Sequence, residues 1–304
     1  MRNIYLTERT AADIDKQVSK ILRGLGNPTT PIDLEAVYTL QRLDAQYYNK
    51  SDDGVMRETI SRVKVGVKLF FEDPTRIWDA VKKADLKALY IPTQRKILID
   101  GDLHVMKKRW NGAHEIGHSI LDWHQDYTWG DTQTTLSQAC HEQLEAEANY
   151  AAGRLLFKQE QFDGHVKGEK HTLKGIGKIA KAFGNSWTST LYRTVETLDV
   201  PAFAVIGAHP LIGVDDKYRY FVASPSFLNH FPSFSEGDMD NIFPTYCGYL
   251  TKGPVGEGTF ELTDARSERH AFVIESFALP YGEVLTLAQS TGRVTRLLSV
   301  GASS

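Results

Sequence analysis

Apolar residues recur at helical spacing near the start of the chain and then alternate over short stretches. Residues 1–24 predict an amphipathic helix whose apolar face is Ile14, Val18, Ile21 and Leu22. A second helix is predicted over residues 31–40, with a proline and an aspartate in its first turns. Short strands are predicted at 43–48, 86–91 and 96–100, the last two on either side of a polar turn at 92–95. Residues 51–83 predict an added strand and helix, to which no function is assigned.

From about residue 200 the pattern changes to strand-like stretches separated by proline, glycine and aspartate. Strands are predicted at 201–207, 218–223, 258–262, 270–280 and within 283–298. The glycine-rich run 251–258 is predicted to be a loop, and it carries no phosphate-binding signature. We therefore expect a mixed sheet with enough residues for a small core of its own.

Composition limits the class of protein. The 304 residues are 41% hydrophobic and hold no apolar run near the length of a membrane span, so a soluble chain of two or three units is expected. The N-terminus lacks the apolar core of a signal peptide. Two cysteines, Cys140 and Cys247, do not make a disulfide framework and fit a reducing cytoplasm. A net charge of −3 argues neither for nor against nucleic acid.

The pattern His-Glu-x-x-His at residues 114–118 carries the clearest chemistry. On a helix, residues four apart lie on one face, so His114 and His118 can reach a single Zn²⁺. Glu115 follows the first histidine directly, which places its carboxylate beside the open position of the metal, where it can take a proton from water. The pattern predicts metal-assisted peptide hydrolysis. The alternative is a surface helix that happens to hold two histidines.

The flanking residues favour a buried helix. An apolar stripe continues through Ile116, Ile120, Leu121 and Trp123. Gly117 has no side chain and lets another backbone approach closely.

Zinc that stays bound while leaving a site for water needs a third protein ligand. Residues 140–157 predict a helix on which Glu145 and Asn149 share one face with Ala148 and Ala152, and the alanines let that face pack closely. Glu145 is the predicted ligand, and Asn149, one turn on, can hydrogen-bond a ligand.

Other residues of this helix compete for the same role. Glu142 lies one turn before Glu145 and faces a similar way, whereas Glu147 lies well round the helix and is expected to be solvated. Cys140 and His141 fall at the helix start without a partner at close spacing, so capping or packing is expected of them.

Two helices separated by a sharp break are predicted over residues 173–195. The first has an apolar face, Gly184-Asn185 interrupts it, and Ser186 can cap the second. This outline is typical of a helix–turn–helix, and basic residues lie on it at Lys174, Lys178, Lys181 and Arg193. DNA contact is one interpretation. The other is that the pair only buttresses the protease core.

These motifs together resemble the ImmA/IrrE metallopeptidases, in particular the longer IrrE-type proteins of the radiation-resistance response. The family pattern is Arg-aromatic-x-x-Ala-His-Glu-x-x-His, then Glu-x-x-x-Asn or Glu-x-x-x-Asp, a run of small residues and Leu-Leu. The segments that match it in order are 109–118, 145–149 and 155–156. Family members usually continue with Met-Pro, where this chain has Phe157-Lys158. They carry a similar helical pair downstream.

The resemblance implies an α+β protein with His114, His118 and Glu145 as metal ligands and Glu115 as catalytic base. It implies a zincin-like metallopeptidase domain over 1–160, a helix-turn-helix-like segment over 161–199 and a GAF-like sensory domain over 200–304. GAF-like domains often bind small molecules; an inert domain or a protein-docking surface is equally compatible.

The function that the resemblance implies is zinc-dependent cleavage of a helix-turn-helix repressor, which would derepress stress-response or mobile-element genes. Mn²⁺ or Fe²⁺ fits the same ligands. No membrane partner is expected, and the sequence leaves direct DNA binding open. The rival is a non-catalytic regulator with a structural metal site that binds DNA or protein. An unliganded carboxylate at Glu115 favours the enzyme, because a structural zinc site does not need it.

Overall fold

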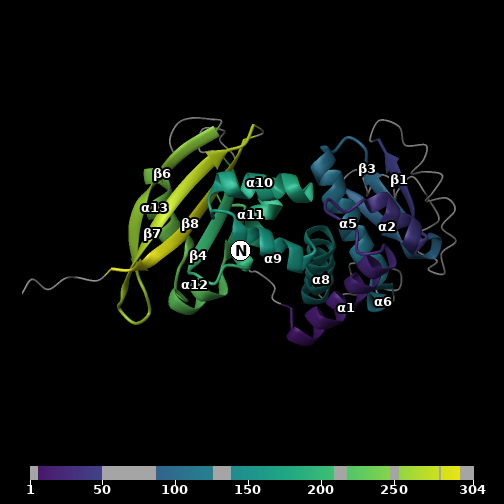
Figure 1. Ribbon diagram of the computed structural model, residues 1–304, viewed down its shortest axis with the longest axis horizontal. Coiled ribbons are helices and arrows are strands. Elements are labelled where there is room, and N and C mark those ends of the chain that lie inside the picture. The colour runs from purple at the N-terminus through teal and green to yellow at the C-terminus, as the bar shows by residue number, and fades with distance from the viewer. Residues whose placement is uncertain are drawn as a thin grey trace, which may run out of the picture. The chain divides into compact units, whose positions relative to one another are not determined.

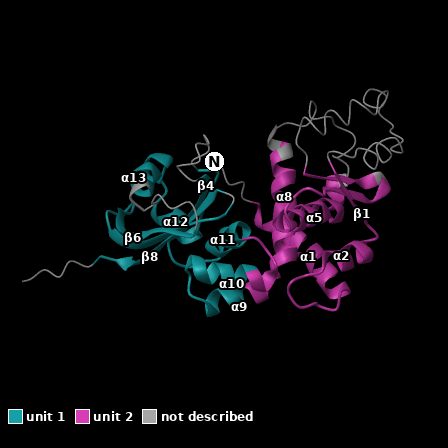
Figure 2. Ribbon diagram, turned by 90° about the horizontal axis from the view of Figure 1, so that it is seen from above, with its two compact units in different colours: residues 1–3, 163–180, 187–304 teal, residues 4–162, 181–186 magenta. Residues whose placement is uncertain are grey.

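The computed structural model describes residues 6–49, 87–125, 138–208, 218–246, 253–280 and 282–294. They form two compact units, which Figure 2 colours separately. The N-terminal unit runs to Phe162 and includes Lys181–Ser186, and the C-terminal unit holds Asp163–Ala180 and the described residues from Trp187 onward. The strand and helix predicted within 51–83 lie outside the described residues, as does Cys247.

The N-terminal unit combines helices with a small sheet (Figure 1). Its elements are α1 (Glu8–Gly24), α2 (Leu34–Gln41), β1 (Asp44–Tyr48), β2 (Ala88–Ile91), η1 (Pro92–Gln94), β3 (Lys96–Asp100), α5 (Val105–Ile120), α6 (Asp122–Gln125) and α8 (Gln138–Phe157). The strand order is β1-β3-β2, with β1 parallel and β2 antiparallel to β3. Within the described parts of residues 1–48 and 86–100, the predicted helices and strands are present, and the polar turn is the 3₁₀ turn η1.

A close crossing of α5 and α8 organises this unit. α5 packs against β2 and β3 and also against α8. A Cβ atom placed on Gly117 would lie 2.8 Å from the carbonyl oxygen of Ala148 and 3.3 Å from the Cβ of Ala151. Only glycine leaves room for the α8 backbone at this point, so the close approach predicted at Gly117 is confirmed. The crossing brings residues 114–118 next to α8.

We expect Gly117→Ala to destabilise the protein, although alanine is the better helix former. The added methyl group must push apart two packed backbones, which typically costs about 1–3 kcal/mol. Gly153→Ala is the matched control, because a Cβ on this glycine of α8 meets nothing within 4 Å. Denaturant unfolding of both variants measures the effect. Equal stability of the two would contradict the close crossing.

The C-terminal unit is built on a single antiparallel sheet. The elements that follow α8 are α9 (Gln159–Gly168), α10 (Leu173–Phe183), α11 (Trp187–Glu196), β4 (Ala202–Ala208), β5 (Tyr220–Ala223), α12 (Pro225–His230), α13 (Glu236–Tyr246), β6 (Gly253–Thr263), β7 (Arg269–Ala278) and β8 (Glu283–Arg293). The strand order is β5-β4-β8-β7-β6, and every neighbouring pair is antiparallel.

Two predictions for this unit were wrong. The described strands do not form a mixed sheet, because every neighbouring pair among them is antiparallel. The connections between β6, β7 and β8 are also too short for the crossover that parallel strands require. The part of the glycine-rich run from Gly253 to Gly258 is strand rather than loop, since it pairs with β7. A register shift between Pro254 and Gly256 accommodates the irregular residues. The helices α12 and α13 were not predicted.

The helical pair α10 and α11 packs on the sheet of the C-terminal unit. Leu173 and Ile176 of α10 and Leu191 and Val195 of α11 belong to one buried cluster. Strand residues of the same cluster include Ala204, Ile206, Val222, Leu285 and Leu287. The break at Gly184 is confirmed, with φ +63°. The interpretation that the pair buttresses the protease core is confirmed only for the end of α10, where Phe183 packs against Phe157 and Phe162. The rest of the buried face covers the C-terminal sheet.

Among the described residues, no helix is long and apolar enough to cross a membrane.

Candidate metal centre

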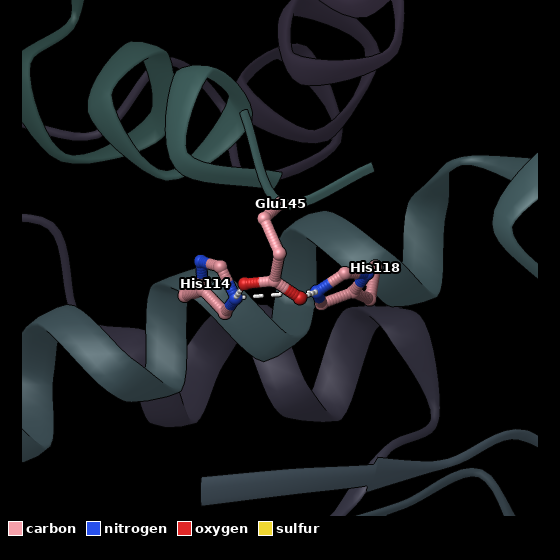
Figure 3. Close-up of side chains that lie close together, drawn as sticks. All are labelled: His114, His118 and Glu145. Atoms are coloured by element: carbon pink, nitrogen blue, oxygen red, sulfur yellow. Dashed lines mark hydrogen bonds and ion pairs between the residues drawn. The ribbon is translucent and has the colours of Figure 1, made fainter. Parts of the chain in front are cut away.

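Three potential ligands meet where α5 and α8 cross. His114 and His118 lie one turn apart on α5, and their Nε2 atoms are 3.2 Å from each other. Glu145 approaches from α8 and spans the two rings (Figure 3). Its Oε2 lies 3.3 Å from Nε2 of His114, and its Oε1 lies 3.5 Å from Nε2 of His118. The structure therefore brings together the three residues that the sequence singled out as ligands.

The partners on the far side of each ring fix which nitrogen is free. Nδ1 of His114 lies 3.0 Å from the amide oxygen of Asn149. That oxygen only accepts, so Nδ1 donates, and Nε2 of the neutral ring keeps its lone pair. The support expected from Asn149 is confirmed.

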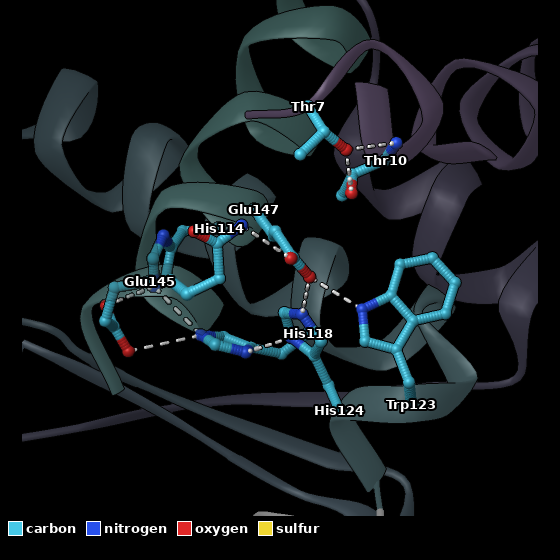
Figure 4. A network of polar contacts seen from close by, with 9 residues as sticks. Thr7, Thr10, His114, His118, Trp123, His124, Glu145 and Glu147 are labelled. Atoms are coloured by element: carbon cyan, nitrogen blue, oxygen red, sulfur yellow. Dashed lines mark hydrogen bonds and ion pairs between the residues drawn. The ribbon is translucent and has the colours of Figure 1, made fainter. Parts of the chain in front are cut away.

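A longer chain of hydrogen bonds also fixes which ring nitrogen of His118 keeps its lone pair (Figure 4). Oε2 of Glu147 accepts from Nε2 of His124 at 2.9 Å and from Nε1 of Trp123 at 2.6 Å. Burial is the largest cause that lowers the pKa of His124, to about 4, so its ring is neutral near pH 7. A neutral His124 that donates through Nε2 must accept at Nδ1, which lies 2.8 Å from Nδ1 of His118. His118 therefore donates there, and its Nε2 keeps its lone pair.

Two imidazole lone pairs and a carboxylate thus converge on one point. Burial disfavours ionised Glu145, but the hydrogen bonds and attraction that His114 and His118 provide when their rings are protonated outweigh burial and hold the pKa of the carboxyl well below its usual range. For His114, burial lowers the pKa, yet the hydrogen bonds and charges from its acidic neighbours and Asn149 outweigh burial and raise it. The cluster attracts positive charge, either a proton or a cation.

The donor set and its spacing fit a divalent metal ion. Zinc bonds of about 2.0–2.1 Å in a tetrahedral arrangement place ligand atoms about 3.3 Å apart. The three separations here run from 3.2 to 3.5 Å. The 3.3 and 3.5 Å distances belong to different oxygens of Glu145, and one ligand atom from each of the three residues lies within 4.8 Å of the others, so His114, His118 and Glu145 could hold such an ion together.

The competing carboxylates are placed differently. Glu142 is exposed and does not belong to the cluster. Glu147 was expected to be solvated, and that prediction was wrong, because Glu147 is only 6% exposed. Burial alone would raise the pKa of Glu147, but hydrogen bonds from Trp123, Gln143 and His124 outweigh burial and lower the pKa.

Glu115 lies beside the cluster and not in it. It is buried, and its carboxylate accepts a hydrogen bond from the backbone N–H of Tyr90 in β2. Burial is the largest cause that raises the pKa of Glu115, and nearby Glu145 adds to it. The charges of His114 and His118 and the Tyr90 hydrogen bond act in the opposite direction. A carboxyl group with a raised pKa holds a transferred proton more readily than an ordinary glutamate does.

Sequence reasoning missed His124, and it misjudged Glu147, which it named as a competing carboxylate but expected to be solvated. His124 lies beyond the end of α5, in α6, so no helical repeat connects it with His118. A third histidine within six residues of His118 was the available signal.

Comparison with known proteins identifies a family domain in the segment that contains this cluster. Residues 63–194 match the family model of the IrrE N-terminal-like domain, Peptidase_M78, and this segment contains all the residues discussed above as ligands or base. The resemblance to the ImmA/IrrE family is thereby confirmed for that segment. The fold is similar to that of a Mycobacterium tuberculosis transcriptional regulator, with 13% identity, a TM-score of 0.52, and coverage of 93% of this chain and 78% of that one. No curated protein matches the sequence.

Proposed function

Because residues 63–194 match the IrrE N-terminal-like domain, we propose that this protein is a zinc-dependent endopeptidase. The observation that carries the proposal is the convergence of His114, His118 and Glu145 at 3.2–3.5 Å beside the buried carboxylate of Glu115. The three clustered residues are the proposed ligands. A structural zinc site is usually closed by four protein ligands, whereas only these three converge among the described residues.

In the proposed peptide hydrolysis, the metal ion and the side chains of this protein have different roles. Bound Zn²⁺ would supply Lewis-acid polarisation of the scissile carbonyl and lower the pKa of the attacking water. Glu115 accepts the proton of that water and returns it to the amine that leaves. Asn149 and His124 hold the two imidazoles so that each Nε2 faces the same point.

We propose that the substrate lies along β2 in an extended conformation. The Tyr90 N–H bond to Glu115 places this strand alongside the base. Among the described strands, β2 pairs only with β3, so a peptide can add to its other edge by main-chain hydrogen bonds. The alternative is a hairpin of β2 and β3 with a purely structural role. The contact between Tyr90 and Glu115 favours the substrate-binding role.

The proposed substrate is a helix-turn-helix transcriptional repressor, as the family resemblance implies, and the C-terminal unit is proposed to be a GAF-like regulatory domain. The helical pair gives little support to direct DNA binding. Its apolar faces are buried, Arg193 is paired with Glu196 at 3.1 Å, and Lys178 is paired with Glu169 at 2.9 Å. We therefore assign α10 and α11 a packing role.

The direct test is to incubate the purified chain with the repressor encoded nearest to its gene, with and without a chelator. We expect cleavage that stops when the metal is removed and resumes when Zn²⁺ is added back. Mn²⁺ and Fe²⁺ are tested in the same assay, because the ligand set accepts them. Cleavage that is insensitive to chelation would refute the metal-dependent mechanism.

We expect His124→Ala to lower the metal affinity of this site by roughly 10–100-fold, as is typical when an outer partner of a ligating histidine is lost. The change removes the acceptor that holds Nδ1 of His118. Trp123→Phe removes only one of the donors to Glu147 and should have a smaller effect. Competition with a chelator measures both. An unchanged affinity in His124→Ala would show that the hydrogen-bond chain does not support the metal.

A further inference from the structure

The C-terminal unit holds a second group of residues with metal-binding side chains. His230 lies at the end of α12, Asp264 directly follows β6, and His270 lies near the start of β7. One potential ligand atom from each residue lies within 4.8 Å of the other two. Asp264 is 6% exposed and His270 4% exposed, while His230 is half-buried. None of the three takes part in the proposed peptidase site.

The two oxygens of Asp264 have different partners. Oδ1 accepts hydrogen bonds from the backbone N–H groups of Arg266 at 2.8 Å and Glu268 at 2.9 Å, which hold the turn between β6 and β7. Oδ2 lies 3.1 Å from Nε2 of His270. The turn therefore occupies one oxygen and directs the other at the histidine.

His230 is held in the tautomer that a metal requires. Its Nδ1 lies 2.8 Å from the backbone carbonyl oxygen of Ser226. A carbonyl oxygen only accepts, so Nδ1 carries the proton, and Nε2 of the neutral ring keeps its lone pair. Ligating histidines commonly donate their other ring nitrogen to a carbonyl in this way.

We propose that His230, Asp264 and His270 form a second metal site, which takes Zn²⁺ or a similar divalent transition-metal ion. Two imidazole nitrogens and one carboxylate oxygen are a donor set that zinc accepts. The 3.1 Å between Asp264 and His270 is close to the separation of about 3.3 Å that tetrahedral zinc ligands have. The ion would take the place of the proton between these two residues, and Nε2 of His230 would be its third protein ligand.

A purely structural hydrogen bond between Asp264 and His270 is the alternative. It would explain the buried pair but assigns no role to His230. The ring of His230 lies edge-on to that of His270, with centroids 5.3 Å apart. The backbone N–H of Ala265 also donates to the carbonyl of His230 at 2.9 Å. The metal would thus join α12 to a hairpin that it already contacts and would couple the stability of this unit to metal supply.

The test uses the full-length chain with His114→Ala and His118→Ala, which disables the proposed peptidase site. Co²⁺ is titrated into the metal-free protein and followed by its visible absorption, and Zn²⁺ is then used to displace it. We expect one equivalent to bind. Adding His230→Ala should weaken this binding by more than the roughly 10–100-fold that loss of an outer partner costs. His165→Ala, which changes an exposed histidine of the same unit, is the control.

A second measurement covers the case in which the double variant fails to fold. In the otherwise unchanged chain, the zinc content should fall from two ions to one with His230→Ala and stay at two with His165→Ala. The proposal is overturned if the His114→Ala, His118→Ala variant binds neither Co²⁺ nor Zn²⁺ while its circular dichroism spectrum shows that it is folded. It is also overturned if His230→Ala leaves metal content and affinity unchanged. Neither outcome affects the peptidase site, whose ligands lie in the other unit.

Discussion

Glu115→Gln is expected to leave the protein folded and metal-loaded while removing its proteolytic activity. Glutamine has the size and shape of glutamate, and its amide oxygen can still accept the hydrogen bond from the Tyr90 N–H. It cannot take a proton from water. Loss of a general base typically lowers the rate roughly 10²–10⁴-fold, and we expect an effect of this size in kcat.

The matched control is Glu142→Gln, the same chemical change at an exposed carboxylate of α8. Cleavage rate and metal content are measured together for both variants. Glu142→Gln should match the parent protein in both quantities. If Glu115→Gln lost its metal along with its activity, Glu115 would be a ligand and not the base.

The proposed site could be predicted largely from the sequence because its geometry is local. Two histidines four residues apart must share a helix face, and a glutamate with an asparagine four residues later must share another. The one long-range requirement, that the two faces meet, was also visible in Gly117 and the small residues of α8. A crossing this close demands residues without bulk at the point of contact.

The surroundings of the site depend on contacts that no local pattern encodes. Glu147 lies away from the ligand face of α8, which is why solvation was expected. Trp123 and His124, contributed by the chain after α5, bury its carboxylate and satisfy it with hydrogen bonds. Whether a carboxylate is exposed or paired is decided by which segment folds over it.

The C-terminal sheet was misjudged for a different physical reason. Glycine and proline in 251–258 predicted a loop, since both residues weaken strands. The long neighbouring strand β7 supplies enough pairing partners to hold this irregular segment in the sheet. Tertiary pairing thus overrode local preference, as is common for strands.

Glu145→Ala is expected to remove metal from the peptidase site. The two imidazoles would then hold the ion without an anionic partner, and affinity should fall by more than the roughly 10–100-fold typical of outer partners. The measurement is best made with His230→Ala also present, so that only one proposed site contributes to the metal content.

Alanine at the other two acidic positions of α8 separates the roles of the three carboxylates. Glu147→Ala removes the acceptor for His124 and Trp123, so it should lower the metal affinity by only the roughly 10–100-fold typical of outer partners. Glu142→Ala should change nothing, since its side chain is exposed and lies outside the cluster. The expected loss of affinity falls in the order Glu145, Glu147, Glu142. Glu145 would contact the ion directly, Glu147 only orients a ligand, and Glu142 does neither. Greater loss of metal in Glu147→Ala than in Glu145→Ala would reverse the assignment.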